Sequence, residues 1–186
     1  NANVTYAEKH YGEGSGTGER ILNPVTQIFL EEGAVFTLDT AQIGGVDSTV
    51  RKTEVSMEAD AKLFVMEKLM THDNQTAVSD MTVEMNGAGS SAQIVSRSVA
   101  KGHSVQTFHP IAIGNALCHA HVQCDSIIMD KAQISSIPEI NARDIDAQII
   151  HEAAIGRINN EQILKLRTFG MTEEEAEAVI IEDFLA

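Results

Sequence analysis

The chain has 186 residues, which fits one domain or one domain with a small appendage. It carries 13 lysines and arginines against 27 aspartates and glutamates, so its formal net charge is −14. This charge argues against nucleic acid and against an anionic membrane surface as partners, because both need clustered basic side chains. Hydrophobic residues make up 43% of the chain but aromatic residues only 4%, so the core must consist mainly of aliphatic side chains and methionine.

No apolar run approaches the roughly 20 residues that span a bilayer, and no secretory leader is visible. The two cysteines, Cys118 and Cys124, are a poor disulfide framework. Reduced thiols in a cytoplasmic protein are therefore expected. The chain begins at Asn1 rather than at a methionine, so we expect it to be part of a longer protein.

Residues 1–24 are polar and rich in glycine, and the run Y-G-E-G-S-G-T-G-E-R predicts an irregular lead-in. These glycines do not match a phosphate-binding loop, because the G-x-x-x-x-G-K-[ST] pattern is absent and no buried strand precedes them. We therefore expect no nucleotide site in this segment.

Beyond the lead-in, apolar and polar residues alternate, and the same pattern recurs at a fixed distance. Alanines at successive turns lie 27 residues apart, at Ala34, Ala61 and Ala88. Period-two alternation is typical of strands with one buried face, and a longer fixed period is typical of stacked units. Residues 25–156 are therefore predicted to form an all-β solenoid, a parallel β-helix. A β-sandwich is the alternative, but of the dipeptides that close tight hairpins only Asn86-Gly87 occurs at a turn.

Residues 157–186 have a helical pattern instead. Asn159 or Asn160 can cap a first helix and Gly170 can end it, while T-E-E-E from Thr172 forms a capping box for a second helix. Two short helices cannot build their own core, so they must dock on the solenoid or on another protein, and the residues leave both open. If they dock on another protein, the apolar residues that would contact it are Ile163, Leu166, Phe169, Val179 and Phe184.

The stretch H-A-H-V-Q-C-D-S, residues 119–126, places two histidines and a cysteine close together. If it lies on a strand, His119 and His121 share one face, whereas Cys118 and Cys124 share the other face, which points inward. The cluster therefore splits, and the histidines do not easily join Cys124 on one metal ion. A closed zinc site needs four ligands, usually from two cysteine pairs, and there is no second pair. We interpret Cys118 as a small buried hydrophobe and the histidines as surface or interface residues.

A second candidate is the adjacent pair His151 and Glu152. Neighbouring residues on a strand point to opposite faces, so these two side chains would not ordinarily act together. The H-E-x-x-H zinc motif is absent, because position 155 is isoleucine. Residue patterns alone thus indicate an acidic solenoid with a partly open metal site.

Five blocks follow one another over residues 123–185: Q-C-D-S-I-I-M-D-K-A, S-I-P-E-I, H-E-A-A-I-G-R-I, E-Q-I-L-K-L-R-T-F-G-M-T-E-E-E-A and I-I-E-D-F-L. In order and spacing they resemble the C-terminal half of the SufB/SufD family of iron–sulfur cluster assembly scaffolds. The earlier stretches E-K-H-Y-G-E-G-S-G-T-G-E-R and S-R-S-V-A-K are similar to single-gene members of that family. The resemblance covers most of the chain.

The resemblance implies a right-handed parallel β-helix, followed by a helical segment that docks a SufC-type ABC ATPase. It implies that Cys124 is a cluster ligand and that His151 and Glu152 are further ligands or proton carriers. A second rank of candidates contains His119, His121 and Cys118. Family members assemble clusters where two subunits meet. In the two-gene version of the family, SufB carries the cysteine and SufD contributes the histidine, so the two chains form a heterodimer. Since one chain here carries all three main residues, a homodimer can replace that heterodimer.

By this resemblance the protein is an assembly scaffold and not an enzyme. It would build a transient iron–sulfur cluster and transfer it to acceptor apoproteins in the cytoplasm. Mixed ligation should hold a cluster less firmly than four thiolates do. No residue pattern indicates a flavin. Two rival interpretations are a β-helix metal-dependent hydrolase or lyase and a structural solenoid that only binds partners. A third keeps the scaffold but places zinc or another metal at the site instead of a cluster. Family chains are usually longer, so we expect a further N-terminal portion.

Overall fold

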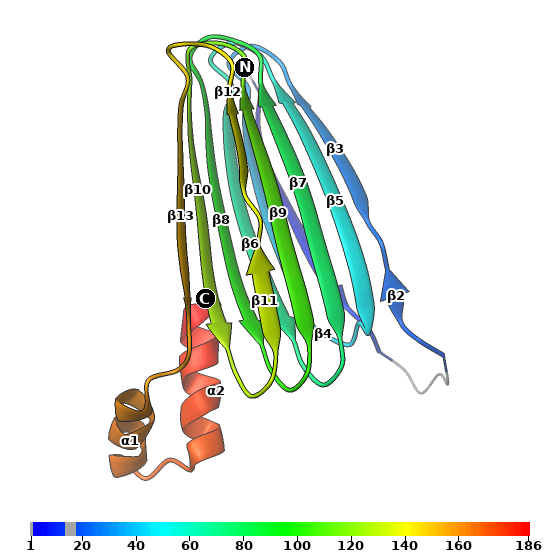
Figure 1. Cartoon of the computed structure of the whole chain (residues 1–186). Coiled ribbons are helices and arrows are strands. Elements are labelled where there is room, and N and C mark those ends of the chain that lie inside the picture. The colour runs from blue at the N-terminus through cyan, green and yellow to red at the C-terminus, as the bar shows by residue number, and fades with distance from the viewer. Residues whose placement is uncertain (1, 14–17) are drawn as a thin grey trace.

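The structure is a computed structural model that describes residues 2–13 and 18–186. Its strands form two sheets that face each other, and the chain crosses from one sheet to the other at each corner (Figure 1). Every strand pairing within the described residues is parallel. The architecture is therefore a parallel β-solenoid followed by two short helices, which confirms the predicted fold class.

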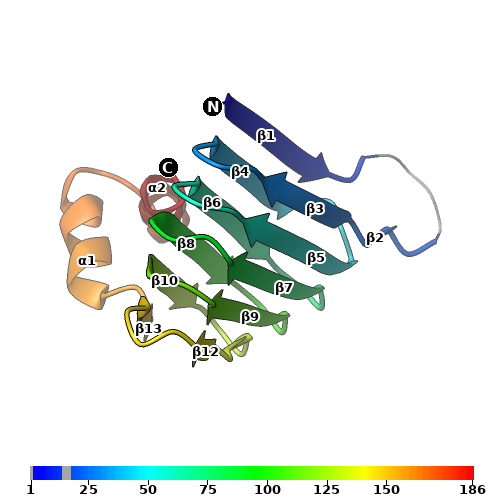
Figure 2. The same ribbon diagram turned by 90° about the horizontal axis from the view of Figure 1, so that it is seen from above.

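The first sheet contains, in spatial order, β1 (Asn3–Tyr11), β4 (Val35–Gly44), β6 (Lys62–Thr71), β8 (Ser90–Ala100), β10 (Cys118–Ile128) and β13 (Gln148–Gly156). The second sheet contains β2 (Ile21–Leu22), β3 (Val25–Leu30), β5 (Ser48–Met57), β7 (Thr76–Met85), β9 (Val105–Gly114), β11 (Gln133–Ser136) and β12 (Glu139–Ala142). The helices are α1 (Asn160–Thr168) and α2 (Glu173–Phe184). In Figure 2 the molecule is seen from above, and the stack of turns runs across the picture from β1 at one end to β12 and β13 at the other.

Apolar and polar residues alternate along the strands, so every second side chain points into the core. Inward side chains that are register partners on successive strands form rows across each sheet. One row of the first sheet passes through register partners on four neighbouring strands: Leu38, Val65, Ile94 and Val122. None of these four side chains is more than 3% exposed. Burying each of them contributes about 1.5–3 kcal/mol relative to leaving it in water. The rows continue because each turn repeats the pattern of the turn before it.

Glycines and aspartates form the corners between the sheets. Asp60 and Asp73 have positive φ angles of 55° and 52°, which aspartate tolerates better than most residues. A Cβ atom on Gly87 would collide with the backbone of Ala59 on the neighbouring turn, so this position requires glycine. The Asn86-Gly87 dipeptide therefore forms a corner between strands of different sheets and not a hairpin. The sandwich alternative is wrong.

The glycine-rich lead-in contains more regular structure than the sequence predicts. Residues 1–24 were expected to be irregular, but β1 and β2 lie within them. β1 pairs with β4 because Val4 and Tyr6 alternate with polar residues and extend the inward rows. The alternation of apolar and polar residues in β1 could have predicted this strand, but the glycines that follow it suggested an irregular segment. Residues 14–17 of the glycine run lie outside the described residues.

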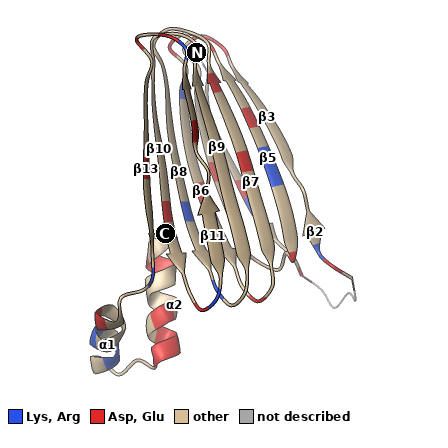
Figure 3. Cartoon of the chain, viewed as in Figure 1, with Lys and Arg blue, Asp and Glu red and all other residues tan. Residues whose placement is uncertain are grey.

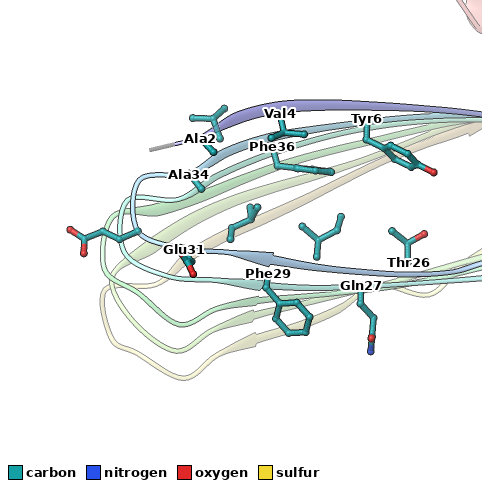
Figure 4. Close-up of a pocket in the computed structure, with 13 residues that line it drawn as sticks. Ala2, Val4, Tyr6, Thr26, Gln27, Phe29, Glu31, Ala34 and Phe36 are labelled. Carbon is teal, nitrogen blue, oxygen red and sulfur yellow. The ribbon is translucent and has the colours of Figure 1, made fainter.

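The N-terminal end of the solenoid has an apolar mouth of about 610 Å³ (Figure 4). Val4 and Tyr6 line it from β1, and Ile28 and Phe36 line it from the following turn. Tyr6 is 48% exposed, whereas its register partner Leu38 is 1% exposed. The pocket is thus formed by inward side chains at the first turn, at the end of the stack opposite to β13.

Part of the core is polar and contains a buried charge pair. Nε of Arg51 lies 3.8 Å from Oε1 of Glu67, and both residues are at most 5% exposed. The Glu67 carboxylate also accepts hydrogen bonds from Ser79 Oγ at 2.7 Å and from Ser96 Oγ at 3.1 Å. Nη1 of Arg51 lies 3.6 Å from Oε2 of Glu8. These partners offset the cost of removing both charges from water.

Both C-terminal helices begin at the predicted caps. Asn159 caps α1, where its side chain accepts a hydrogen bond from the backbone N–H of Glu161 at 2.9 Å. Thr172 and Glu175 form a capping box at the start of α2. Neither helix is long and apolar enough to cross a membrane.

α2 docks on the outer face of the first sheet, beside the strand ends that lead to the lower corners (Figure 1). Val99 of β8 is 0% exposed because it packs in one cluster with Leu185, directly after α2. Nζ of Lys101 forms an ion pair with Oε2 of Glu177 at 3.1 Å. Docking within the chain therefore holds for α2, whereas α1 has no buried residue.

Candidate functional site

β10 separates the histidines from the cysteines, as strand geometry predicts. Cys118 and Cys124 are buried on the inner face, at 5% and 3% exposure. His119 is exposed and His121 is half-buried, and both lie at outward positions. The compact cluster suggested by H-A-H-V-Q-C-D-S therefore does not exist as one site.

The inner face brings Cys124 together with a residue from the last strand. Sγ of Cys124 lies 3.3 Å from Nε2 of His151. The register of β10 and β13 pairs Cys124 with Ala153 and Val122 with His151, so the contact is diagonal across the two strands. Both side chains point inward because they occupy the inward phase of their strands.

Burial keeps this pair neutral. Burial raises the pKa of the Cys124 thiol to about 11, while the Ser136 hydroxyl opposes the rise and the carboxylates of Glu67 and Asp125 add to it. Burial also lowers the pKa of His151. With a protonated thiol and an uncharged ring, the tautomer of the imidazole decides which of Sγ and Nε2 donates in this contact. Both groups are soft or borderline metal ligands once the thiol loses its proton.

Glu152 does not join this pair. It lies on the outer face, where its Oε2 atom is 3.4 Å from Nε2 of His121, and its side chain is 65% exposed. Cys118 is also separate, because it begins β10 and packs beside Gly114. Of the three main candidates, the structure thus brings together Cys124 and His151 on the inner face and leaves Glu152 with His121 outside.

A single chain supplies few ligands at this place. Within the described residues, no group of three or more His, Cys, Asp or Glu side chains is arranged to hold a metal ion. The Cys124–His151 pair lies under the last turn, where β13 pairs with β10 and β12 pairs with β9.

Sequence reasoning missed two polar residues near the thiol. Glu67 and Ser136 line the same small interior space as Cys124. Glu67 occupies the inward phase of β6 among Leu63, Val65 and Leu69, so a charge at an inward position was the available signal. For Ser136 no such signal exists, because serine is common at both phases of a strand.

The predicted partner residues on the helices fall into two groups. Phe169 is 74% exposed and Val179 is 42% exposed, whereas Ile163 and Leu166 are half-buried. Phe184 instead packs on the solenoid against the cluster around Val99. The exposed apolar surface is thus carried by α1 and the outer side of α2. In Figure 3 basic residues are visible on α1 and acidic residues on α2.

These features define a class of protein, a parallel β-solenoid that holds a buried thiol against an imidazole under its last turn and ends in two short helices. Comparison with known families gives a match in the same region. The family model for "SUF system FeS cluster assembly, SufBD core domain" matches residues 59–184. The chain belongs to the SufBD family of iron–sulfur cluster assembly proteins.

Similar proteins carry the same family name. The iron–sulfur cluster assembly SufBD family protein of Methanocaldococcus jannaschii is 28% identical over 190 residues, which cover 100% of this chain and 58% of the relative. That of Pyrococcus horikoshii is 30% identical over 193 residues, with 100% and 56% covered. That of Archaeoglobus fulgidus is 28% identical over 170 residues, with 88% and 45% covered. The chain spans about half the length of these relatives.

Proposed function

We propose that this chain is the scaffold part of a SUF-type assembly complex, in which Cys124 is a ligand of the nascent iron–sulfur cluster. The observation that carries the proposal is the 3.3 Å contact between Sγ of Cys124 and Nε2 of His151 in a member of the SufBD family. Both atoms leave their mutual hydrogen bond when they bind iron, and the thiol proton is released. His151 is the second ligand.

The remaining ligands come from a second copy of the chain. Two groups per chain are too few for a cluster, and a twofold interface presents each of them twice. The last turn is suited to such an interface. Ile140 on β12 and Ile155 on β13 occupy inward positions but are 49% and 46% exposed. A partner on this end would bury both side chains and close the thiol site from water.

The resemblance implies that Glu152 is either a ligand or a proton carrier, and the second role is the one we propose. Because it faces outward beside His121, it serves as a proton carrier at the rim of the interface. His121 shares that role, and His119 lies further out. Cys118 remains a buried hydrophobe without a function in ligation.

Residues 157–186 dock a SufC-type ATPase, and residues 25–156 together with β1 form the β-helix core. The exposed side chains of Phe169 and Val179 support this proposal, because exposed apolar patches on a protein surface mark interaction sites. The complex transfers its cluster to acceptor apoproteins. Free thiols in both cysteines favour the reducing cytoplasm as its place of work.

The rival interpretations have less support. A metal-dependent hydrolase or lyase would need His151 and Glu152 on one metal ion, but these side chains lie on opposite faces of β13. A structural solenoid gives no reason for a buried thiol–imidazole contact. Neither rival accounts for the family of the chain.

The test is anaerobic co-purification of the full-length protein with the SufC-type ATPase of its own SUF system. We expect a stable complex that becomes brown, with broad visible absorption, when iron and sulfide are supplied. A complex that forms but stays colourless after reconstitution would contradict the cluster role. A protein that takes up a cluster without retaining the ATPase would contradict the partner role alone.

A further inference from the structure

Two buried polar atoms of the second sheet have no hydrogen-bond partner within the described residues: Oε1 of Gln106 on β9 and Oγ of Ser136 on β11. Both side chains face the interior, because Gln106 is 2% exposed and Ser136 is the register partner of the inward-facing Phe108. A buried polar atom without a partner is costly, and most such atoms in folded proteins are satisfied by the protein or by ordered water. Two of them at one place point to a bound group that satisfies both.

The orientation of the Gln106 amide is fixed by its nitrogen. Nε2 donates to the backbone carbonyl of Val99 at 2.9 Å and to Oγ1 of Thr71 at 2.8 Å. Because the Val99 carbonyl can only accept, the nitrogen and not the oxygen of the amide must face it. Both amide hydrogens are thus used, and Oε1 is left as an acceptor that needs a donor from elsewhere.

Gln106 and Ser136 are diagonal neighbours across β9 and β11. The register pairs Gln106 with Ile134, so Ser136 lies two residues further along β11 on the same inward face. Both side chains line one interior space of about 10 Å³. A volume of about 10–15 Å³ is the least that holds a water molecule, and a buried water needs two to four polar partners. The space therefore has room for one water molecule, and the two side chains supply its partners.

Four other hydroxyls that line this space have partners of their own. Ser98 and Ser126 share a hydrogen bond of 2.9 Å. The hydroxyls of Ser79 and Ser96 both donate to the Glu67 carboxylate. Within the described part of the chain, the unsatisfied hydrogen-bonding capacity of the space therefore comes from the glutamine and the serine of the second sheet.

We propose that this space is a binding site for one water molecule, which donates a hydrogen bond to Oε1 of Gln106 and accepts one from the hydroxyl of Ser136. Cys124 lines the same space from the first sheet. The water is thus a proton acceptor and donor in the interior beside a thiol that must lose its proton before it binds a metal. The site does not depend on the proposed function, because side chains of the second sheet form it.

The test is a set of crystal structures of the metal-free full-length protein, at a resolution that shows ordered water. We expect a density peak within hydrogen-bond distance of both atoms in the wild type. The same peak should remain in Ser135→Ala, which removes an exposed, outward hydroxyl on the same strand. It should be lost in Gln106→Met, which removes the acceptor at similar size, and in Ser136→Val, which removes the hydroxyl and fills part of the space.

Water relaxation dispersion by nuclear magnetic resonance tests the same site in solution, because it counts water molecules that stay inside a protein. Ser136→Val should hold one such water fewer than the wild type and Ser135→Ala. A wild-type structure without the peak would overturn the inference, and so would equal water counts in Ser136→Val and Ser135→Ala. Neither result bears on cluster assembly, which reconstitution of the wild type tests separately.

Discussion

Sγ of Cys124 lies 3.3 Å from Nε2 of His151, although 27 residues separate them in the chain. The contact joins the two last strands of the first sheet, so it depends on the solenoid and not on local sequence. Because His151 lies on β13, the last strand, the pair is near the end of the stack where a second subunit can reach it. The main consequences of this arrangement can be measured.

His151 and Glu152 should differ sharply although they are neighbours. His151→Ala should reduce the cluster content after reconstitution by about 10-fold or more, because it removes a group in contact with the sulfur. Glu152→Gln should change the content by less than about twofold, because the side chain is outside and paired with His121. Iron and acid-labile sulfide analyses measure both. Equal losses in the two variants would contradict the assignment of separate roles.

Stability should fall at high pH through Cys124. Its pKa rises from the ordinary 9.0 to about 11 in the folded protein, so between these values the folded state binds more protons than the unfolded state. The protonated Cys124 thiol therefore contributes about 1–3 kcal/mol to the free energy of unfolding. This contribution is intact below about pH 9 and is lost as the pH rises towards 11. Urea unfolding at pH 8 and pH 10.5 should show a smaller pH effect in Cys124→Ala. The same loss in both proteins would refute this account.

The buried charge pair should be sensitive to removal of one partner. Arg51→Met leaves Glu67 buried without its cation and should cost about 3–5 kcal/mol in the free energy of unfolding. The double variant Arg51→Met/Glu67→Gln should recover part of this loss. Lys52→Met, which changes an exposed neighbour, should stay within about 0.5 kcal/mol. Denaturant unfolding tests all three, and a single variant no worse than the double variant would be inconsistent with a buried pair.

Two apolar residues of the helical segment, Leu185 and Phe169, should respond differently to truncation. Leu185→Ala opens the contact with Val99 and should destabilise the docking of α2 by about 2–3 kcal/mol, visible as faster amide exchange in α2. Phe169→Ala changes a side chain that is 74% exposed, so the free energy of unfolding should move by less than about 0.5 kcal/mol. It should instead weaken ATPase binding. If Phe169→Ala binds the ATPase as the wild type does, α1 is not part of the docking surface.

Strand geometry allowed us to predict that the histidines and the cysteines of β10 lie on opposite faces of the strand, because the alternation of side chains is a local property of the backbone. The inward position of Cys124 followed from Ala120 and Val122 alone. The contact with His151 could not be derived in that way. A strict 27-residue repeat would place His151 directly beside Cys124, but the actual register places Ala153 there. The length of each corner sets this offset, and corner lengths vary along the chain.

The helical segment shows a second limit of sequence reasoning. Its caps at Asn159 and Thr172 were predictable, because they need only neighbouring residues. The docking of α2 was not, because an apolar helix face does not specify which surface covers it. β1 was also not predicted, because the glycine-rich run that follows its alternating residues suggested an irregular segment.

The most direct test of the central claim is anaerobic reconstitution of the wild type, Cys124→Ala and Cys118→Ala with iron and sulfide. Cys118 is the matched control, because it is also buried on the inner face of β10 but lies away from His151. We predict visible cluster absorption for the wild type and for Cys118→Ala, and a colourless Cys124→Ala protein. A Cys124→Ala protein with the same spectrum and iron content as the wild type would contradict the account.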